Sequence, residues 1–162
     1  MFAAQFGLHY PPMKRLFLLL LTAVLLGSVA PARAQVLMRG NLDYVTSFSR
    51  VRIYIEDITN FGPERTGRLR LRMFASKEHW REDHPGRLIA FSLFPRLFPG
   101  EDREDIVLSR PLRRPHDDGW YYVTLVLEER MFDDEGRARW VIQDQVSFGR
   151  EYFYDDNPFP WD

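Results

Sequence analysis

The chain has no cysteine among its 162 residues. It therefore has neither a disulfide framework nor a cysteine that could carry a lipid. Positive charge is not in excess either, because 22 lysines and arginines stand against 23 aspartates and glutamates. Nucleic acids and anionic membranes favour proteins with concentrated positive charge. The composition thus argues against both as partners and leaves the apolar core as the main source of stability.

The sequence also lacks the motifs of common catalytic sites. It contains no Gly-x-Ser-x-Gly, no cysteine nucleophile and no glycine-rich phosphate loop. A glycosidase needs two carboxylates held across a sugar-binding cleft, and the sequence implies no such cleft. We therefore predict that the chain is not an enzyme and holds no cofactor.

An apolar run long enough to span a bilayer, which takes about 20 residues as a helix, is missing as well. The run Leu16–Leu26 is shorter, follows Lys14-Arg15 and precedes Ala32-Arg33-Ala34. These are the three parts of a secretory signal peptide. We predict a Sec-type signal-peptide helix over residues 1–34, cleaved after Ala34, with Met13 as an alternative start; a retained anchor is the other interpretation.

Removal of this segment leaves 128 of the 162 residues, and the loss of three basic residues changes the formal net charge from −1 to −4. A chain of this size forms one domain with its own core. We predict a bacterial protein that is periplasmic or secreted, without stable membrane insertion after cleavage.

Gly119–Arg130 is the clearest single element of the mature chain. Aromatic and β-branched residues dominate it, and no proline interrupts it. Both alternating sets of side chains are largely apolar, as in a strand that is covered on one face and partly on the other. We predict that this strand lies in the centre of a sheet.

In other segments, apolar and polar residues alternate with period two, and turn residues separate these segments from one another. Pro95 favours an edge position or a strand end, and Asn41 favours a turn near the start of the chain. The fold class is therefore predicted as all-β: an antiparallel, immunoglobulin-like β-sandwich of about seven strands over residues 35–148, with a tail over 149–162. A barrel is the alternative. The alternating segments are Tyr44–Ile58, Gly67–Ala75, Arg87–Leu97, Asp105–Leu112 and Arg137–Phe148.

Three groups of strand and turn residues form a recognisable pattern. They are Ile58-x-Asn60 with Thr66-Gly67-x-Leu69-Arg70-Leu71 and Ala75, then Tyr121–Glu129, then Val141-x-x-Asp144-x-Val146-x-Phe148. The chain resembles a small exported bacterial β-sandwich domain, and more loosely the CARDB and immunoglobulin-like sandwiches. The resemblance covers Val51–Phe148 and implies an accessory or adhesion-type module without an established chemistry. The charged hairpin Met131–Arg139 and the aromatic tail depart from the pattern.

Arg68, Arg70 and Arg72 alternate with apolar residues. Such a stripe suits a carboxylate or a sulfated sugar, but cross-strand pairing with glutamates such as Glu128 and Glu129 is the more ordinary interpretation.

Asp144 falls between Ile142 and Val146, in a strand whose Trp140 and Phe148 share the expected core face. An ionised carboxylate there is costly unless it accepts hydrogen bonds. We expect a loop backbone or an arginine to donate them.

Candidate metal ligands are sparse. His79 and His84 share a polar loop with Glu78, Glu82 and Asp83, but two histidines do not complete a zinc site. The acidic pairs, such as Asp133-Asp134, lack the spacing of a calcium loop. No metal site is predicted.

The tail holds several aromatic residues that would form a contact surface if exposed together. The alternative is that they fold back and are buried. The candidate partner-binding residues are Tyr152, Phe153, Tyr154, Phe159 and Trp161.

Two functions follow from the sequence, and an enzymatic role through its scattered acidic residues and histidines is a third alternative. The first is an exported, non-catalytic β-sandwich that binds an unknown protein or cell-envelope component. The second is a carbohydrate-binding module that contacts a glycan through exposed aromatics such as Trp80, Trp120 or Trp161.

Overall fold

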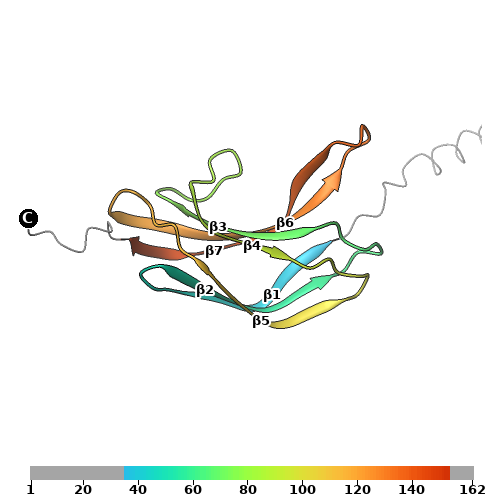
Figure 1. Ribbon diagram of the computed structural model, residues 1–162, viewed down its shortest axis with the longest axis horizontal. Coiled ribbons are helices and arrows are strands. Elements are labelled where there is room, and N and C mark those ends of the chain that lie inside the picture. The colour runs from blue at the N-terminus through green and yellow to red at the C-terminus, as the bar shows by residue number, and fades with distance from the viewer. Residues whose placement is uncertain (1–34, 154–162) are drawn as a thin grey trace, which may run out of the picture. The chain divides into compact units, whose positions relative to one another are not determined.

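The computed structural model describes residues 35–153. The signal peptide predicted over residues 1–34 and the tail beyond Phe153 lie outside the described residues. Two antiparallel sheets face each other, one with strand order β1-β2-β5 and the other with order β4-β3-β6-β7 (Figure 1). The predicted all-β class with antiparallel strands is confirmed. The strands are β1 (Val36–Thr46), β2 (Arg50–Asn60), β3 (Leu69–Ser76), β4 (Arg87–Phe94), β5 (Asp102–Pro111), β6 (Gly119–Phe132) and β7 (Ala138–Phe153).

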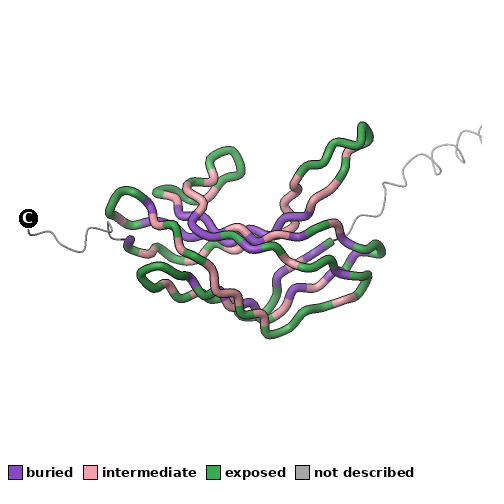
Figure 2. The backbone as a smooth tube through the Cα atoms, viewed as in Figure 1, coloured by how far each residue is buried: buried purple, intermediate pink, exposed green. Residues whose placement is uncertain are grey.

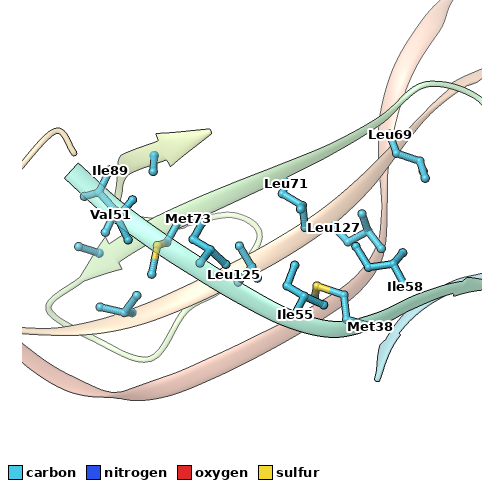
Figure 3. Packing of buried hydrophobic residues seen from close by; sticks show 14 of the residues in the cluster. Met38, Val51, Ile55, Ile58, Leu69, Leu71, Met73, Ile89, Leu125 and Leu127 are labelled. Carbon is cyan, nitrogen blue, oxygen red and sulfur yellow. The ribbon is translucent and has the colours of Figure 1, made fainter. Parts of the chain in front are cut away.

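The apolar core lies between the two sheets (Figure 2). Alternation along β6 turns Val123, Leu125 and Leu127 inward, where all three are fully buried. They belong to one cluster with the inward residues of β2 and β3 (Figure 3). Each buried aliphatic side chain of this kind stabilises the fold by about 1.5–3 kcal/mol. Burial of alternate residues from both sheets is therefore what fixes the register of the strands.

The strand predicted at Gly119–Arg130 is β6, and it lies between β3 and β7. Its central position is confirmed. Its outer face is covered in part, because Thr124 and Val126 are buried there while Trp120 is exposed. The edge position predicted from Pro95 is also confirmed, since β4 ends the four-stranded sheet.

The prediction of one strand over Tyr44–Ile58 is wrong, because the chain turns between β1 and β2. Ser47 donates its backbone N–H to the carbonyl of Arg50 at 2.8 Å and closes the turn. The turn expected at Asn41 is instead a β-bulge inside β1, where the register shifts between Arg39 and Leu42. Gly40 has a φ of 72° there, and Glu56 accepts the Asn41 N–H at 2.7 Å.

The prediction that Trp140 and Ile142 of β7 lie on the core face is also wrong. A register shift between Leu127 and Glu128 of β6 pairs Leu127 with Asp144 but Glu128 with Ile142. The bulge therefore moves Trp140 and Ile142 to the outer face, while Val146 and Phe148 still pack against the core. β7 also continues to Phe153, past the expected end of the sandwich at Phe148.

Asp144 accepts hydrogen bonds from backbone N–H groups, but the donors belong to strands and not to the expected loop or arginine. One carboxylate oxygen accepts the N–H of Met38 at 2.8 Å, and the other accepts the N–H of Gln145 at 2.8 Å. Met38 belongs to β1 and Asp144 to β7, so this contact joins the edges of the two sheets.

The arginine stripe is paired in large part, as expected. Arg70 and Arg72 both contact Glu128 of β6 at 2.6 Å, and the Glu128 side chain is nearly buried. One carboxylate held by two guanidinium groups is well compensated for its burial.

Glu129 has a different environment from its neighbour Glu128. It is 3% exposed, and one carboxylate oxygen accepts the N–H of Gly67 at 2.5 Å. The other oxygen is buried without a hydrogen-bond partner among the described residues. Burial raises the pKa of Glu129, and the Gly67 N–H opposes that shift only in part.

No helix that is long and apolar enough to cross a membrane occurs among residues 35–153.

Asp144→Ala should destabilise the protein by about 1–3 kcal/mol, because it leaves the Met38 N–H without its acceptor. Asp134→Ala is the control, since Asp134 is exposed in the hairpin turn and should cost less than about 0.5 kcal/mol. Chemical denaturation measures both. Equal midpoints for the two variants would contradict the assigned role of Asp144.

Glu129→Gln should stabilise the protein increasingly as the pH rises. The raised pKa means that the neutral carboxyl is favoured in the folded state, so its stability contribution is present at low pH and is lost as Glu129 ionises. Melting temperatures at pH 3.5 and pH 8 test this expectation. The variant and the natural protein should melt together at pH 3.5, and a difference that does not grow with pH would refute the argument.

Candidate aromatic binding surface

The first residues of β6 carry aromatic side chains on the outer face of the four-stranded sheet. Trp120 is 55% exposed and lies opposite Tyr152 of β7 in the ladder. The two rings meet edge to face, with centroids 5.3 Å apart, and Tyr152 is 37% exposed. Alternation in two neighbouring strands thus presents two large rings to solvent side by side.

The next outward residues along these strands extend the surface. Tyr122 lies opposite Arg150, whose guanidinium is 5.0 Å from the centroid of the Tyr122 ring. His79, from the loop between β3 and β4, stacks on Tyr122 with ring centroids 4.2 Å apart. We call Trp120, Tyr122, Tyr152, His79 and Arg150 the aromatic surface.

A shallow hollow of about 660 Å³ adjoins the Trp120–Tyr152 pair. The residues Asp43–Thr46 of β1 form one wall, and Phe148–Tyr152 of β7 form another. Val45 is exposed and apolar, whereas Asp43, Arg150 and Glu151 supply charge. The hollow therefore combines apolar rings with a few polar groups, as ligand sites commonly do.

Glu151 and Tyr44 interact in the wall of the hollow. The Thr46 hydroxyl donates to one oxygen of Glu151, and the other oxygen is buried without a hydrogen-bond partner in the described part of the chain. Burial, and next the neighbouring Glu151 carboxylate, raise the pKa of Tyr44. Tyr44 also packs edge to face on Phe148, with centroids 4.8 Å apart. This wall is thus held by side-chain packing as well as by the ladder.

The structure divides the residues predicted from the tail. Tyr152 belongs to the aromatic surface, but Phe153 is 2% exposed and packs on Tyr121 with ring centroids 5.8 Å apart. Successive residues of a strand point to opposite faces, so two adjacent aromatics cannot share one surface. Tyr154, Phe159 and Trp161 lie outside the described residues.

Two other tryptophans do not join this surface. Trp80 is half-buried against Phe74, with ring centroids 6.3 Å apart. Trp140 lies under the guanidinium of Arg70, 3.9 Å from the ring centroid. Both rings cover the outer face of the sheet.

The polar loop does not gather its candidate metal ligands. His79 stacks on Tyr122, while His84 lies 3.4 Å from the Asp83 carboxylate. Within residues 35–153, no three of the histidines and acidic residues come together as a possible metal site.

Sequence reasoning missed Arg150 and the wall residue Asp43. Arg150 could have been found from its spacing, because residues two apart in a strand share a face and Tyr152 was already a candidate. Asp43 comes from a strand distant in sequence, and no local pattern links it to Tyr152.

No family model matches the chain, and no curated protein is a significant match. The resemblance to CARDB domains therefore remains a prediction. Among solved structures, the chain is similar to β-glucosidase 3B from Thermotoga neapolitana in complex with glucose. The match covers 77% of this chain and 17% of that chain, with 19% identity and a TM-score of 0.41. A β-glucosidase from Streptomyces venezuelae gives 11% identity over 72% of this chain, 15% of that chain and a TM-score of 0.37. A β-glucosidase from Kluyveromyces marxianus gives 14% identity over 77% of this chain and 15% of that chain, with a TM-score of 0.37.

The chain thus spans less than a fifth of the length of these structures. The comparison contradicts the prediction that the chain is not an enzyme, because the matched structures are enzymes. That prediction is withdrawn. The low TM-scores and partial coverage assign no activity to this chain.

Proposed function

We propose that this chain is an exported module that binds a glycan of the cell envelope on its aromatic surface. The observation that carries the proposal is the exposed Trp120–Tyr152 pair beside a hollow with polar walls. Exposed apolar side chains that lie together in one patch mark ligand or partner contacts, whereas single exposed rings are ordinary. Of the two functions expected from the sequence, this arrangement favours the glycan.

The chemistry of the surface suits a sugar ring. A pyranose presents C–H groups on its faces and hydroxyls around its rim, and the faces pack well on an aromatic ring. Trp120 and Tyr152 offer rings for such packing, and the Tyr152 hydroxyl is a polar handle. Asp43 and Arg150 can exchange hydrogen bonds with the rim hydroxyls. Apolar contact supplies the affinity, and the polar groups select the sugar.

We also propose that the sandwich is immunoglobulin-like. The first, second and fifth strands share one sheet, and the third, sixth and seventh share the other, as in immunoglobulin domains. The fourth strand joins β3 here instead of the sheet that holds β1 and β2. Export itself rests on the signal peptide predicted over residues 1–34. Many cell-surface domains share this architecture, which supports a role in the envelope.

The test is affinity electrophoresis in gels that contain soluble glucan, xylan or mannan, together with co-sedimentation on purified peptidoglycan. At least one of these glycans should retain the natural protein. Trp120→Ala should weaken that retention at least tenfold while leaving the melting temperature nearly unchanged, since Trp120 is 55% exposed.

The matched control is Phe132→Ala, which removes another exposed aromatic ring, from the β6–β7 hairpin. It should leave glycan retention unchanged. If none of the four glycans retains the natural protein, or if both variants lose retention equally, the proposal is wrong.

A second candidate function, a protein partner, is favoured by the edge strand β4. Phe91 is 52% exposed and Leu93 is also exposed on its outer face. A groove of about 430 Å³ runs between β4 and the end of β5, and Arg110 and Arg113 line it. An exposed apolar edge strand is a template for the addition of a strand. The arginines favour an extended segment that carries acidic residues.

A synthetic peptide with alternating valine and glutamate tests this second function by fluorescence anisotropy. Phe91→Lys should weaken binding of the peptide at least tenfold, because it removes the apolar contact on β4. Val107→Lys adds the same charge at an exposed residue of β5 outside the groove. Equal effects of the two substitutions, or no binding by the natural protein, would exclude the groove.

A further inference from the structure

The end of β6 opposite the aromatic surface carries a second hollow, with a volume of about 410 Å³. Arg65 and Arg68 line it from the segment before β3, Arg96 from the segment after β4, and Arg130 from β6. Glu129 completes this set of charged side chains, which we call the arginine pocket. Residues from three parts of the chain thus bring four arginines and one glutamate to the lining of a single hollow.

None of the four arginines forms an ion pair with a carboxylate among the described residues. Arg65 packs over the Phe98 ring at 4.4 Å, and Arg130 lies 5.6 Å from the centroid of the Phe132 ring. Arg68 and Arg96 are exposed. By contrast, Arg70 and Arg72 on the same sheet share the carboxylate of Glu128. Positive charge is therefore concentrated at this pocket in a chain with a formal net charge of −1.

The buried carboxyl group gives the second, independent observation. Glu129 is 3% exposed, and its second oxygen has no hydrogen-bond partner among the described residues. Gly67 holds the first oxygen through its N–H. A side chain at position 67 would lie 2.1 Å from the carbonyl oxygen of Arg130, so only glycine allows this close approach. A buried polar atom without a partner is costly unless something outside the described chain satisfies it.

We propose that the arginine pocket binds a uronic acid residue of an anionic polysaccharide. Guanidinium groups bind carboxylates through paired, charge-assisted hydrogen bonds, which suits the acidic group of the sugar. A neighbouring sugar hydroxyl donates to the free oxygen of Glu129. A nucleic-acid backbone fits less well, because a phosphodiester itself carries no hydrogen-bond donor for Glu129, whereas hydroxyl groups flank the carboxylate of a uronic acid. This site lies apart from the aromatic surface and does not rest on the function proposed above.

Isothermal titration calorimetry with oligogalacturonate tests the proposal. The natural protein should bind it with an affinity that falls as salt is added. Arg68→Ala combined with Arg96→Ala should weaken binding at least tenfold, and both side chains are exposed, so the fold should be retained. The control combines Arg81→Ala with Arg103→Ala, which removes the same charge from outside the pocket. The affinity of this control variant for oligogalacturonate should stay within twofold of the affinity of the natural protein.

Two single substitutions and three alternative ligands sharpen the test. Glu129→Gln should weaken oligogalacturonate binding, because the amide presents one acceptor oxygen instead of two. Trp120→Ala should leave this binding unchanged, so that failure at the aromatic surface is distinguishable from failure here. Absence of binding at low salt, or equal loss in both double variants, would overturn the proposal. So would equal affinity for sulfate or phosphate alone, which would indicate a simple anion site, and so would tighter binding of polyuridylate RNA.

Discussion

The contact between the inner faces of β6 and β2 is the constraint on which the rest of the structure depends. No disulfide supports the domain, so the burial of residues such as Leu125, Leu127 and Ile55 has to outweigh the entropy lost on folding. Because these side chains lie at alternate positions, a slip of one residue would turn the whole set outward. The same alternation then decides which side chains of β6 reach solvent.

Strand β6 contributes residues to both candidate sites. Trp120 and Tyr122 face outward at its start, and Glu129 faces inward near its end, where it accepts the N–H of Gly67. The partner strands supply the other residues at each end. β7 brings Tyr152 and Arg150 to the aromatic surface, and the segments that flank β3 and β4 bring arginines to the pocket. The central strand thus separates two surfaces of different chemistry on one small domain.

Pro95 indicated the edge position of β4, and period-two alternation was enough to predict β6 and the all-β class. It failed where the geometry depends on a partner strand. The turn at Ser47–Ser49 was not predicted, because it has no glycine or proline and lies between two β-prone runs. The bulge at Gln143 changes the face of Trp140, and only the pairing with β6 reveals it.

The candidate sites also contain some residues that local alternation predicts and others that only the packing of distant segments brings together. Tyr152 was a candidate from the sequence, and continued alternation would have separated it from Phe153 and added Arg150. Of the arginine pocket, local alternation indicated Arg68 alone, because Arg65, Arg96 and Arg130 join it only through the packing of distant segments. Glu129 was expected to pair with an arginine. Its actual partner, the N–H of Gly67, is a backbone group that no side-chain pattern can indicate.

The tip of the β6–β7 hairpin offers a practical opportunity. Figure 1 shows the hairpin projecting from the four-stranded sheet, away from β1, β2 and β5. Asp133 ties the turn together by accepting N–H groups of Glu135 and Arg137. Gly136 has open space around it. A thiol introduced at Asp134 would be unique in the chain, so a fluorophore or a surface linker could be attached there without touching the core.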